Sequence, residues 1–410
     1  MNLKSNIAGV ALSFALLTGT GGVFASQSPE YDRITDDMAS LRELELLQPI
    51  DIEVQTRAEL QQWLAGELES YPEEEQAIDE RILVVFGFID PGTDVGDLEG
   101  EILGEQIAGF YDPETQAMVV VVADDSEELS ANDELTFAHE VVHALQDQHF
   151  NLMDVQGDIE DVADDEYLAL KSLIEGDATV GQVMYLLEYP DLLDAVQSEL
   201  ADYESPSLDA APLFYSESLL FPYDQGATFV AEIYGEGGWE AVDQMYSDPP
   251  TSTEQILHPE KYLDREQPIS VTVADPSSAL GDGWEVLDQN VMGEFLSDVF
   301  LRNGGARNSD ARDASEGWGG DEYIVVGNDD ETAFTWTSTW DTDDDADEFF
   351  NVLVGSESRR LEADVEALGD ESHIRLDGNG YVGEIVLDGD TVTYTLAESA
   401  QTLDTMIGNT

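Results

Sequence analysis

The spacing of apolar positions changes several times along the chain, and each change predicts a different element. Apolar residues recur at three- and four-residue intervals over 60–68, directly after Thr56 and Glu59, which form a capping box, so a helix is predicted there. The run RILVVFGFI (81–89) is short, continuous and rich in β-branched residues, which favours a buried strand. The segment 107–122 predicts two strands that are joined by a turn at an Asp-Pro pair.

Two long helices are predicted in the middle of the chain. Ser130 and Asp133 form a second capping box, and the apolar positions that follow through residue 150 keep a helical spacing. Residues 165–189 show the same spacing and predict the second long helix. Further helices are expected within 191–247, between proline-containing turns. The middle of the chain is therefore predicted to be mainly helical.

The last third of the chain has a different pattern. Residues 303–316 are mostly small and polar and predict a loop or linker. Beyond them we expect strands near 323–326, 333–339, 381–387 and 392–396, a helix near 345–353 and a last helix at the end. The fold class is predicted as α+β. The expected parts are an acidic segment (26–75), a mainly helical domain with a small N-terminal sheet (76–270), and a helix with a smaller α+β unit (271–410).

The N-terminus has the pattern of a secretory signal peptide. Lys4 supplies a short positive region, residues 7–17 are apolar, and Val23 and Ala25 place small residues before a cleavage position. We expect residues 1–25 to be removed, leaving a secreted or extracellular protein, or one at the cell surface, without a stable membrane span. The acidic segment that follows is then either a pro-segment or part of the mature domain.

The charge of the chain is extreme. There are 91 Asp and Glu residues against 14 Lys and Arg, which gives a net charge of −77. Such a surface repels itself in dilute buffer, and molar salt screens that repulsion. We interpret the composition as that of a salt-requiring protein from an extreme halophile. The charge argues against nucleic acid or anionic lipid as a partner. The chain has no cysteine, so disulfides and a thiol nucleophile are excluded.

The first of the two long helices carries an H-E-x-x-H motif, His139, Glu140 and His143. Positions i and i+4 lie on one face of a helix, so both imidazoles can bind one Zn²⁺. Glu140 then stands next to the open coordination position, where a carboxylate can act as a base toward water. The pattern predicts a zinc centre, against the alternative of a pair of ordinary surface histidines.

Two residues compete as the third zinc ligand. His149 has the spacing of the H-E-x-x-H-x-x-G-x-x-H pattern, but Gln146 occupies the glycine position, and a helix that continues carries His149 away from the metal. Glu175 lies on the second long helix, which can pack against the first. Gly176 would allow a close approach of the two helices, and Asp177 is a candidate for orienting a ligand. We favour Glu175.

The blocks TFAHEVVHALQDQHF and LIEGDATV resemble the secreted H-E-x-x-H zinc metallopeptidases in which a glutamate is the third ligand, the gluzincins. More narrowly, these blocks and IAGFYDPET, TSTEQILHPEKYL and EGWGGDEY resemble a group of exported bacterial and archaeal proteins. The resemblance implies a zincin-like catalytic domain. Thr179 departs from it, since that type usually has an acid four residues after the ligand. The resemblance also implies that a strand of the 107–122 hairpin pairs with substrate.

The resemblance further implies a donor opposite Glu140 that holds the developing oxyanion. The candidates are His258, Tyr223 and Tyr262, and His258 is preferred because it precedes a proline and is biased toward an extended conformation. The predicted function is a secreted zinc endopeptidase acting on peptides or proteins. The alternatives are a zinc amidase for a non-peptide or wall-linked substrate, and a non-enzymatic, zinc-stabilised surface binding protein. The sequence indicates no oligomeric state.

Overall fold

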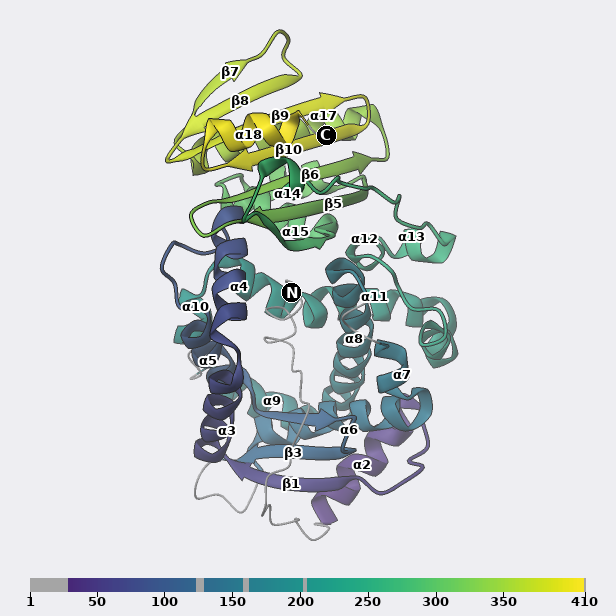
Figure 1. Cartoon of the computed structure of the whole chain (residues 1–410). Helices are drawn as coiled ribbons and strands as arrows, with labels where there is room; N and C mark the ends of the chain where they lie inside the picture. Colours follow the sequence, from purple (N-terminus) through teal and green to yellow (C-terminus); the bar gives the residue numbers. More distant parts are fainter. Residues whose placement is uncertain (1–28, 123–128, 158–161, 202–204, 409–410) are drawn as a thin grey trace.

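The computed structural model describes residues 29–122, 129–157, 162–201 and 205–408, so the expected signal peptide lies outside the described residues. Figure 1 shows a helical middle, with a small sheet at one end and a large sheet at the other. The predicted α+β class is confirmed. No helix in the described ranges is long and apolar enough to cross a bilayer.

The first part of the chain builds the small sheet and the helices around it. The elements are α2 (Pro29–Arg42), β1 (Asp51–Thr56), α3 (Arg57–Ser70), α4 (Glu73–Phe86), α5 (Val95–Gln106), β2 (Gly109–Asp112) and β3 (Ala117–Val122). The strand order is β1-β3-β2, with β1 parallel and β2 antiparallel to β3. The predicted hairpin over 107–122 is confirmed. So is the start of α3, because Thr56 Oγ1 accepts from the Glu59 amide while the Glu59 carboxylate accepts from the Thr56 amide.

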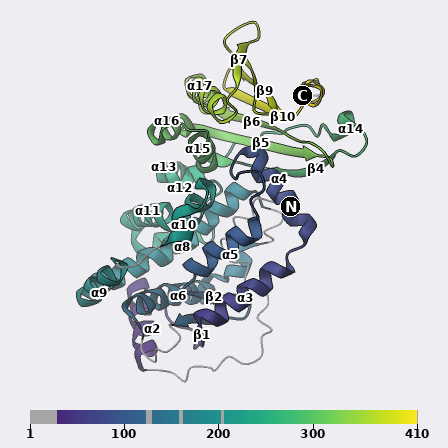
Figure 2. The ribbon, with the colours of Figure 1, turned by 90° about the vertical axis from the view of Figure 1, so that its left-hand side faces the viewer.

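The strand predicted over 81–89 is wrong, because residues 81–86 are the C-terminal part of helix α4 and residues 87–89 follow its end. The helix begins after Pro72, with three glutamates in its first turn, and ends at Gly87, whose φ of 74° only glycine adopts readily. A short apolar run does not distinguish a buried strand from a buried helix. Here the run is buried around most of the helix, because α4 reaches from the helical part to the large sheet (Figure 2).

The helical middle contains both long helices predicted from the sequence. Its elements are α6 (Ala131–Phe150), α7 (Leu152–Gln156), α8 (Asp164–Glu188), α9 (Pro190–Leu200), α10 (Pro206–Ala210), α11 (Leu213–Met245), α12 (Thr253–Leu257) and α13 (Pro259–Asp264). The capping box of Ser130 and Asp133 starts α6 as expected. Helix α11 is interrupted at Gly237 and Gly238, where the backbone leaves helical geometry.

Helices α8 and α11 touch backbone to backbone at two glycines. A Cβ added at Gly176 would lie 2.3 Å from the carbonyl of Gly226, and a Cβ added at Gly226 would lie 2.2 Å from the carbonyl oxygen of Ser172. Gly176 therefore permits a close helix approach, but the partner is α11 and not the first long helix, α6. Gly181 is the glycine of α8 that meets α6, where its Cβ would contact Val142.

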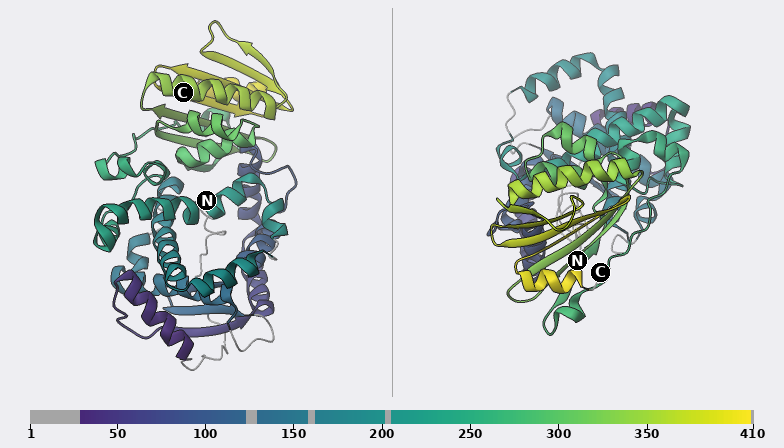
Figure 3. Two further views of the ribbon diagram at one scale, coloured as in Figure 1. Left: turned by 180° about the vertical axis from the view of Figure 1, so that it is seen from behind. Right: turned by 90° about the horizontal axis from the view of Figure 1, so that it is seen from above.

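The C-terminal part is an antiparallel sheet in the order β4-β5-β6-β10-β9-β8-β7. Its strands are β4 (Glu285–Asn290), β5 (Trp318–Gly327), β6 (Thr332–Trp340), β7 (Asp364–Ala367), β8 (His373–Gly378), β9 (Tyr381–Asp388) and β10 (Thr391–Ala397). The helices are α14 (Ser277–Leu280), α15 (Gly293–Asn303), α16 (Asn308–Ser315), α17 (Asp343–Arg360) and α18 (Ala400–Ile407). Helices α17 and α18 lie on opposite faces of the sheet (Figure 3).

The sequence predicted four of these strands and missed β1 in the small sheet and β4, β7 and β8 in the large one. The predicted linker over 303–316 contains α16, so that expectation is wrong in part. Helix α16 has polar and charged residues at most positions, and its burial depends on Ala311 and Ala314 packing into the core. Two small apolar residues give too weak a periodicity to predict a helix.

One hydrophobic core joins the helical middle to the large sheet. Phe86 of α4 shows the connection, because its ring lies 4.8 Å from that of Phe334 and 5.1 Å from that of Tyr323, both in the sheet. Leu173 of α8 and Phe300 of α15 belong to the same core. The helix that carries Glu175 thus shares one core with the C-terminal unit.

A buried carboxyl of this core gives a pH-dependent stability. Burial raises the pKa of Glu99 from 4.5 to about 8, although the Tyr215 hydroxyl donates to its carboxylate. The neutral form is thus favoured in the folded state, so the stabilising contribution is complete below pH 4.5 and is lost as the pH rises through about 8.

We expect Glu99→Gln to flatten the fall in unfolding free energy across this window, by up to about 1.4 kcal/mol per pH unit. Denaturant unfolding between pH 5 and 9 measures it, with the exposed Glu101→Gln of the same helix as control. Identical slopes in wild type and Glu99→Gln would contradict it.

Candidate metal centre

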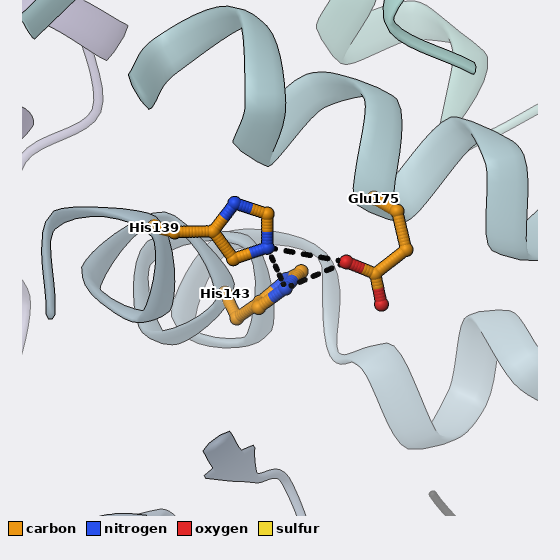
Figure 4. A group of neighbouring side chains, drawn as sticks. All are labelled: His139, His143 and Glu175. Atoms are coloured by element: carbon orange, nitrogen blue, oxygen red, sulfur yellow. Dashed lines mark hydrogen bonds and ion pairs between the residues drawn. The ribbon is translucent and has the colours of Figure 1, made fainter. Parts of the chain in front are cut away.

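Three side chains from two helices converge at one point (Figure 4). His139 and His143 lie one turn apart on α6, and Glu175 faces them from α8. Nε2 of each imidazole lies 3.2 Å from Oε2 of Glu175, and the two Nε2 atoms are 3.1 Å apart. All three side chains are buried. The structure therefore brings together the three residues that the sequence predicted as ligands.

The donor set fits Zn²⁺. Two imidazole nitrogens and a carboxylate oxygen are the protein ligands of one common type of catalytic zinc centre. Ligand atoms about 2.0–2.1 Å from a tetrahedral zinc lie on the order of 3.3 Å from one another, close to the separations found here. His139, His143 and Glu175 would hold the ion, and all three line the cavity described below.

His149 is not part of this group. Helix α6 continues without a break to Phe150, so His149 is carried beyond the two motif histidines. Its Nε2 donates instead to the carbonyl oxygen of Glu45, at 2.7 Å. The helix ends only at Asn151, where φ is 56°. The expected continuation of the helix through Gln146 is thus what separates His149 from the other two imidazoles.

Charge compensation of Glu175 comes from His143 and Lys171. Lys171 lies one turn before Glu175, with Nζ 3.4 Å from Oε1 of the carboxylate. Burial alone would raise the pKa of Glu175, but the charges of His143 and Lys171 and hydrogen bonds from both imidazoles bring it well below the ordinary value. Burial alone would lower the pKa of His143, and the Glu175 carboxylate raises it to about 9 instead. Glu175 is therefore ionised.

The sequence did not identify Gln146, which supports His143 from the far side of its ring. Gln146 follows His143 by one helical turn, and its Oε1 lies 2.9 Å from Nδ1 of that imidazole. The Gln146 amide group donates to Asp177, at 3.1 Å. Asp177 was a candidate for orienting a ligand, and it touches no ligand directly. A polar residue three positions after a ligand, on the same helical face, is the signal that sequence reasoning overlooked.

Glu140 lies beside the small sheet. It is buried, with 7 % of its surface exposed. Burial raises the pKa of its carboxyl, while the two motif histidines and a backbone hydrogen bond from Tyr111 of β2 oppose the shift. Strand β2 comes close to α6 here, since a Cβ added at Gly109 would lie 3.8 Å from Cγ of Glu140. Glu140 thus stands between the edge strand β2 and the converging ligands.

A cavity of about 230 Å³ opens onto this group. Its walls are β2, α6, α7, α8 and α11, and it is lined by His139, Glu140, His143 and Glu175. Tyr223 of α11 lines it as well, with its ring centroid 6.0 Å from that of His139. Burial and the nearby charge of Glu175 raise the pKa of Tyr223 well above its ordinary value, so its hydroxyl is a neutral donor.

The structure does not place His258 at this site, which corrects its assignment as a catalytic residue. His258 joins α12 to α13, and its Nε2 donates to Oε1 of Glu294 on α15, at 2.9 Å. It lines a separate cavity of about 500 Å³ between α11, α12, α15 and α16. The expected extended conformation before Pro259 is not reached, because His258 has φ −126° and ψ 79°, and its imidazole is directed toward α15. Tyr262 is also elsewhere, and its hydroxyl donates to the Asp248 carbonyl.

A second acidic group among the described residues already holds a cation of the chain itself. Glu254, Glu266 and Asp341 converge on Lys261, with carboxylate oxygens 2.5, 3.0 and 2.6 Å from Nζ. The ammonium group fills the centre that a metal ion would take. This group is therefore an ion-pair cluster that joins α12 and α13 to the large sheet.

Comparison with known proteins gives one match. Residues 282–407 match the model of a domain of unknown function, DUF8575. The matched segment contains the large sheet and helices α15 to α18, and it contains none of the residues of the candidate metal centre. No curated protein and no solved structure matches the chain.

Proposed function

We propose that this protein is a secreted, zinc-dependent endopeptidase. The observation that carries the proposal is the convergence of His139, His143 and Glu175 within 3.2 Å, with Glu140 beside them in an open cavity. A structural zinc site has four protein ligands and needs no carboxylate base. Here the neighbouring Glu140 and the cavity fit hydrolysis better than a purely structural site.

Zinc, when bound, supplies a Lewis acid that polarises the scissile carbonyl and makes a water more acidic. The chain's own residues do the proton transfers. The Glu140 carboxylate takes a proton from the attacking water as the new carbon–oxygen bond forms. It then gives that proton to the amine nitrogen as the carbon–nitrogen bond breaks. Burial raises the pKa of the Glu140 carboxyl, which favours the protonated form that the second step needs.

The position of an edge strand at the cavity favours a peptide as the substrate over other amides. Strand β2 is the last strand in the order β1-β3-β2, and all four of its residues line the cavity. An edge strand offers backbone donors and acceptors to an extended chain, which can add to the sheet as a further strand. Such pairing reads the peptide backbone and places an internal bond beside Glu140.

The experiment that tests the proposal is hydrolysis of a peptide library in molar salt, with and without a chelator. We expect cleavage within the peptides, its loss with chelator and its return with added zinc. Cleavage only of a wall-linked or other non-peptide amide would favour the amidase alternative. Tight zinc binding with no hydrolysis of any amide would favour the non-enzymatic binding protein.

Tyr223 is the donor that we expect to hold the oxyanion. Its hydroxyl is neutral and lies at the cavity that contains Glu140, whereas His258 lies in another cavity. We therefore expect Tyr223→Phe to lower kcat by about 10²-fold with KM nearly unchanged, since one oxyanion donor is lost. His258→Gln serves as the control and should leave peptide hydrolysis unchanged. The opposite pattern, with a large loss only in the His258 variant, would contradict this assignment.

A further inference from the structure

We propose that Arg42 of the N-terminal helix is a positioning residue for the metal centre. It acts on His143 through Asp177 and Gln146, and helix α2 is therefore a lasting part of the folded enzyme and not a pro-segment to be removed. This inference rests on the metal centre proposed above. It assigns a role to an arginine in the acidic segment, where the sequence predicted no functional residue.

Arg42 is fully buried although it lies at the end of α2. Its guanidinium donates to both carboxylate oxygens of Asp177, at 2.7 and 3.1 Å, and to Asp243 of α11, at 2.6 Å. The guanidinium plane also lies over the ring of Trp239, 4.1 Å from its centroid. Such a two-point contact fixes the carboxylate in both position and orientation.

Asp177 passes this orientation to Gln146. The Asp177 side chain is fully buried, and Oδ2 accepts from the Gln146 amide at 3.1 Å and from the Tyr246 hydroxyl at 2.7 Å. The same Gln146 nitrogen donates to the carbonyl of Ile174, at 3.0 Å. Two acceptors on one side of the amide require its NH₂ group there. The Gln146 oxygen must therefore face the other way, toward His143.

The consequence for His143 is a fixed tautomer. The Gln146 oxygen can only accept a hydrogen bond, and it lies 2.9 Å from Nδ1 of His143. The proton of the neutral ring must therefore be on Nδ1. The lone pair is then on Nε2, the atom that lies 3.2 Å from Glu175 and faces the metal position. Outer hydrogen bonds of this kind orient ligating histidines and raise their affinity for metal. The chain of contacts thus runs from α2 to the ligand atom.

Arg42 is the cation that keeps this chain in place. Among the side chains that contact Asp177, Gln146 and Tyr246 are uncharged, so Arg42 is the counter-charge in contact with this buried carboxylate in the part of the chain that the structure describes. A buried charge that loses its partner is unfavourable, and the interior must move or admit water around it. The Gln146 amide would then lose the acceptor that orients it. The Gln146 oxygen would no longer be held toward Nδ1 of His143.

Helix α2 is also anchored independently of Arg42. Arg33 donates to Glu134 of α6, and the Trp239 ring nitrogen donates to the carbonyl of Leu41. Strand β1, which follows, adds a parallel edge to β3. Removal of this segment would uncover Asp177 and one edge of the small sheet together. The architecture is that of a permanent element.

The test compares zinc affinity of variants by competition with a chelator in molar salt, after circular dichroism has confirmed folding. Arg42→Gln is expected to bind zinc 10- to 100-fold more weakly, the usual effect of removing an outer partner of a ligand. Arg42→Lys keeps the charge but loses the two-point contact with the Asp177 carboxylate. Its zinc affinity should therefore lie between those of wild type and Arg42→Gln. Arg33→Gln is the matched control on the same helix and should stay within about twofold of wild type.

Coupling distinguishes positioning from general damage. Gln146→Leu breaks the chain of contacts in the middle and should weaken zinc to a similar degree. Arg42→Gln added to Gln146→Leu should then have little further effect. Native zinc affinity in folded Arg42 variants, or fully additive losses in the double variant, would overturn the proposal. Should Arg42→Gln fail to fold, Arg42→Lys and Gln146→Leu carry the same test.

A metal-free readout separates this inference from the proposed function. Nitrogen-15 spectra of histidine-labelled protein, recorded above pH 9 so that the His143 ring is neutral, report which ring nitrogen carries the proton. We expect the Nδ1-protonated form in the neutral ring of wild type, and a mixture of tautomers in Arg42→Gln and Gln146→Leu. Wild type that binds no zinc would contradict the metal centre, and these spectra would still test the contacts. An unchanged tautomer in both variants would overturn the role of Arg42.

Discussion

Glu140→Gln is expected to abolish nearly all hydrolysis while leaving the fold and the bound metal in place. The amide has almost the shape of the carboxylate, but it cannot take a proton from water. General acid–base catalysis contributes roughly 10²–10⁴-fold, so we expect kcat to fall by at least that range, since Glu140 serves both proton transfers. Glu140 is not one of the converging ligand residues, so zinc content should stay near wild type. Initial rates on a cleaved peptide, with metal analysis of the same sample, measure both quantities.

Glu134→Gln on the same helix is the matched control. Glu134 lies at the start of α6, where its carboxylate accepts from Arg33 and from the Tyr185 hydroxyl. It does not line the cavity. We expect a small loss of stability and no loss of kcat from this change. Turnover like that of wild type in Glu140→Gln would remove the proton transfers assigned to this residue.

The second large effect is expected from salt. With 91 acids and 14 basic residues, most carboxylates have no basic partner available, and their repulsion rests on solvent screening. The Debye length is about 3 Å at 1 M salt and about 10 Å at 0.1 M, so unscreened repulsion extends across neighbouring surface acids at the lower salt. We expect the protein to be folded in molar salt and to unfold or loosen near 0.1 M. Circular dichroism and the melting temperature across that range measure the change.

Control solutes distinguish screening from other stabilising effects. A salt with another monovalent cation should restore the fold at equal ionic strength, whereas sucrose at equal osmolality should restore it much less. Ion pairs such as that of Arg42 and Asp177 are buried and little screened, so their strength changes little with salt. They alone would not preserve the fold. A melting temperature that stays flat from molar salt to 0.1 M would contradict the interpretation of the composition.

The candidate site was largely predictable because its signals are local. His139, Glu140 and His143 lie within five positions on a helix whose capping box is also in the sequence. Glu175 followed from a second helix of clear periodicity. The continuation of α6 past Gln146, which excludes His149, followed from the absence of glycine or proline.

The contacts that support the site were not predictable, because they join segments far apart in the chain. Arg42 reaches Asp177 and Asp243 across three different helices, and no spacing rule relates such positions. His258 was misplaced for the same reason, since only the packing of α12 on α15 decides which way its ring faces. In the fold, α4 was mistaken for a strand because burial on most sides removes the periodicity that distinguishes a helix.

The central claim is that Glu175 completes a metal centre with the two motif histidines, and zinc content tests it most directly. Wild type, Glu175→Ala and His149→Ala would be purified in molar salt, equilibrated with zinc, freed of excess metal and measured by atomic absorption. We expect about one zinc per chain in wild type and in His149→Ala, and little in Glu175→Ala, because two imidazoles alone hold zinc weakly. Loss of zinc in His149→Ala with retention in Glu175→Ala would contradict the account.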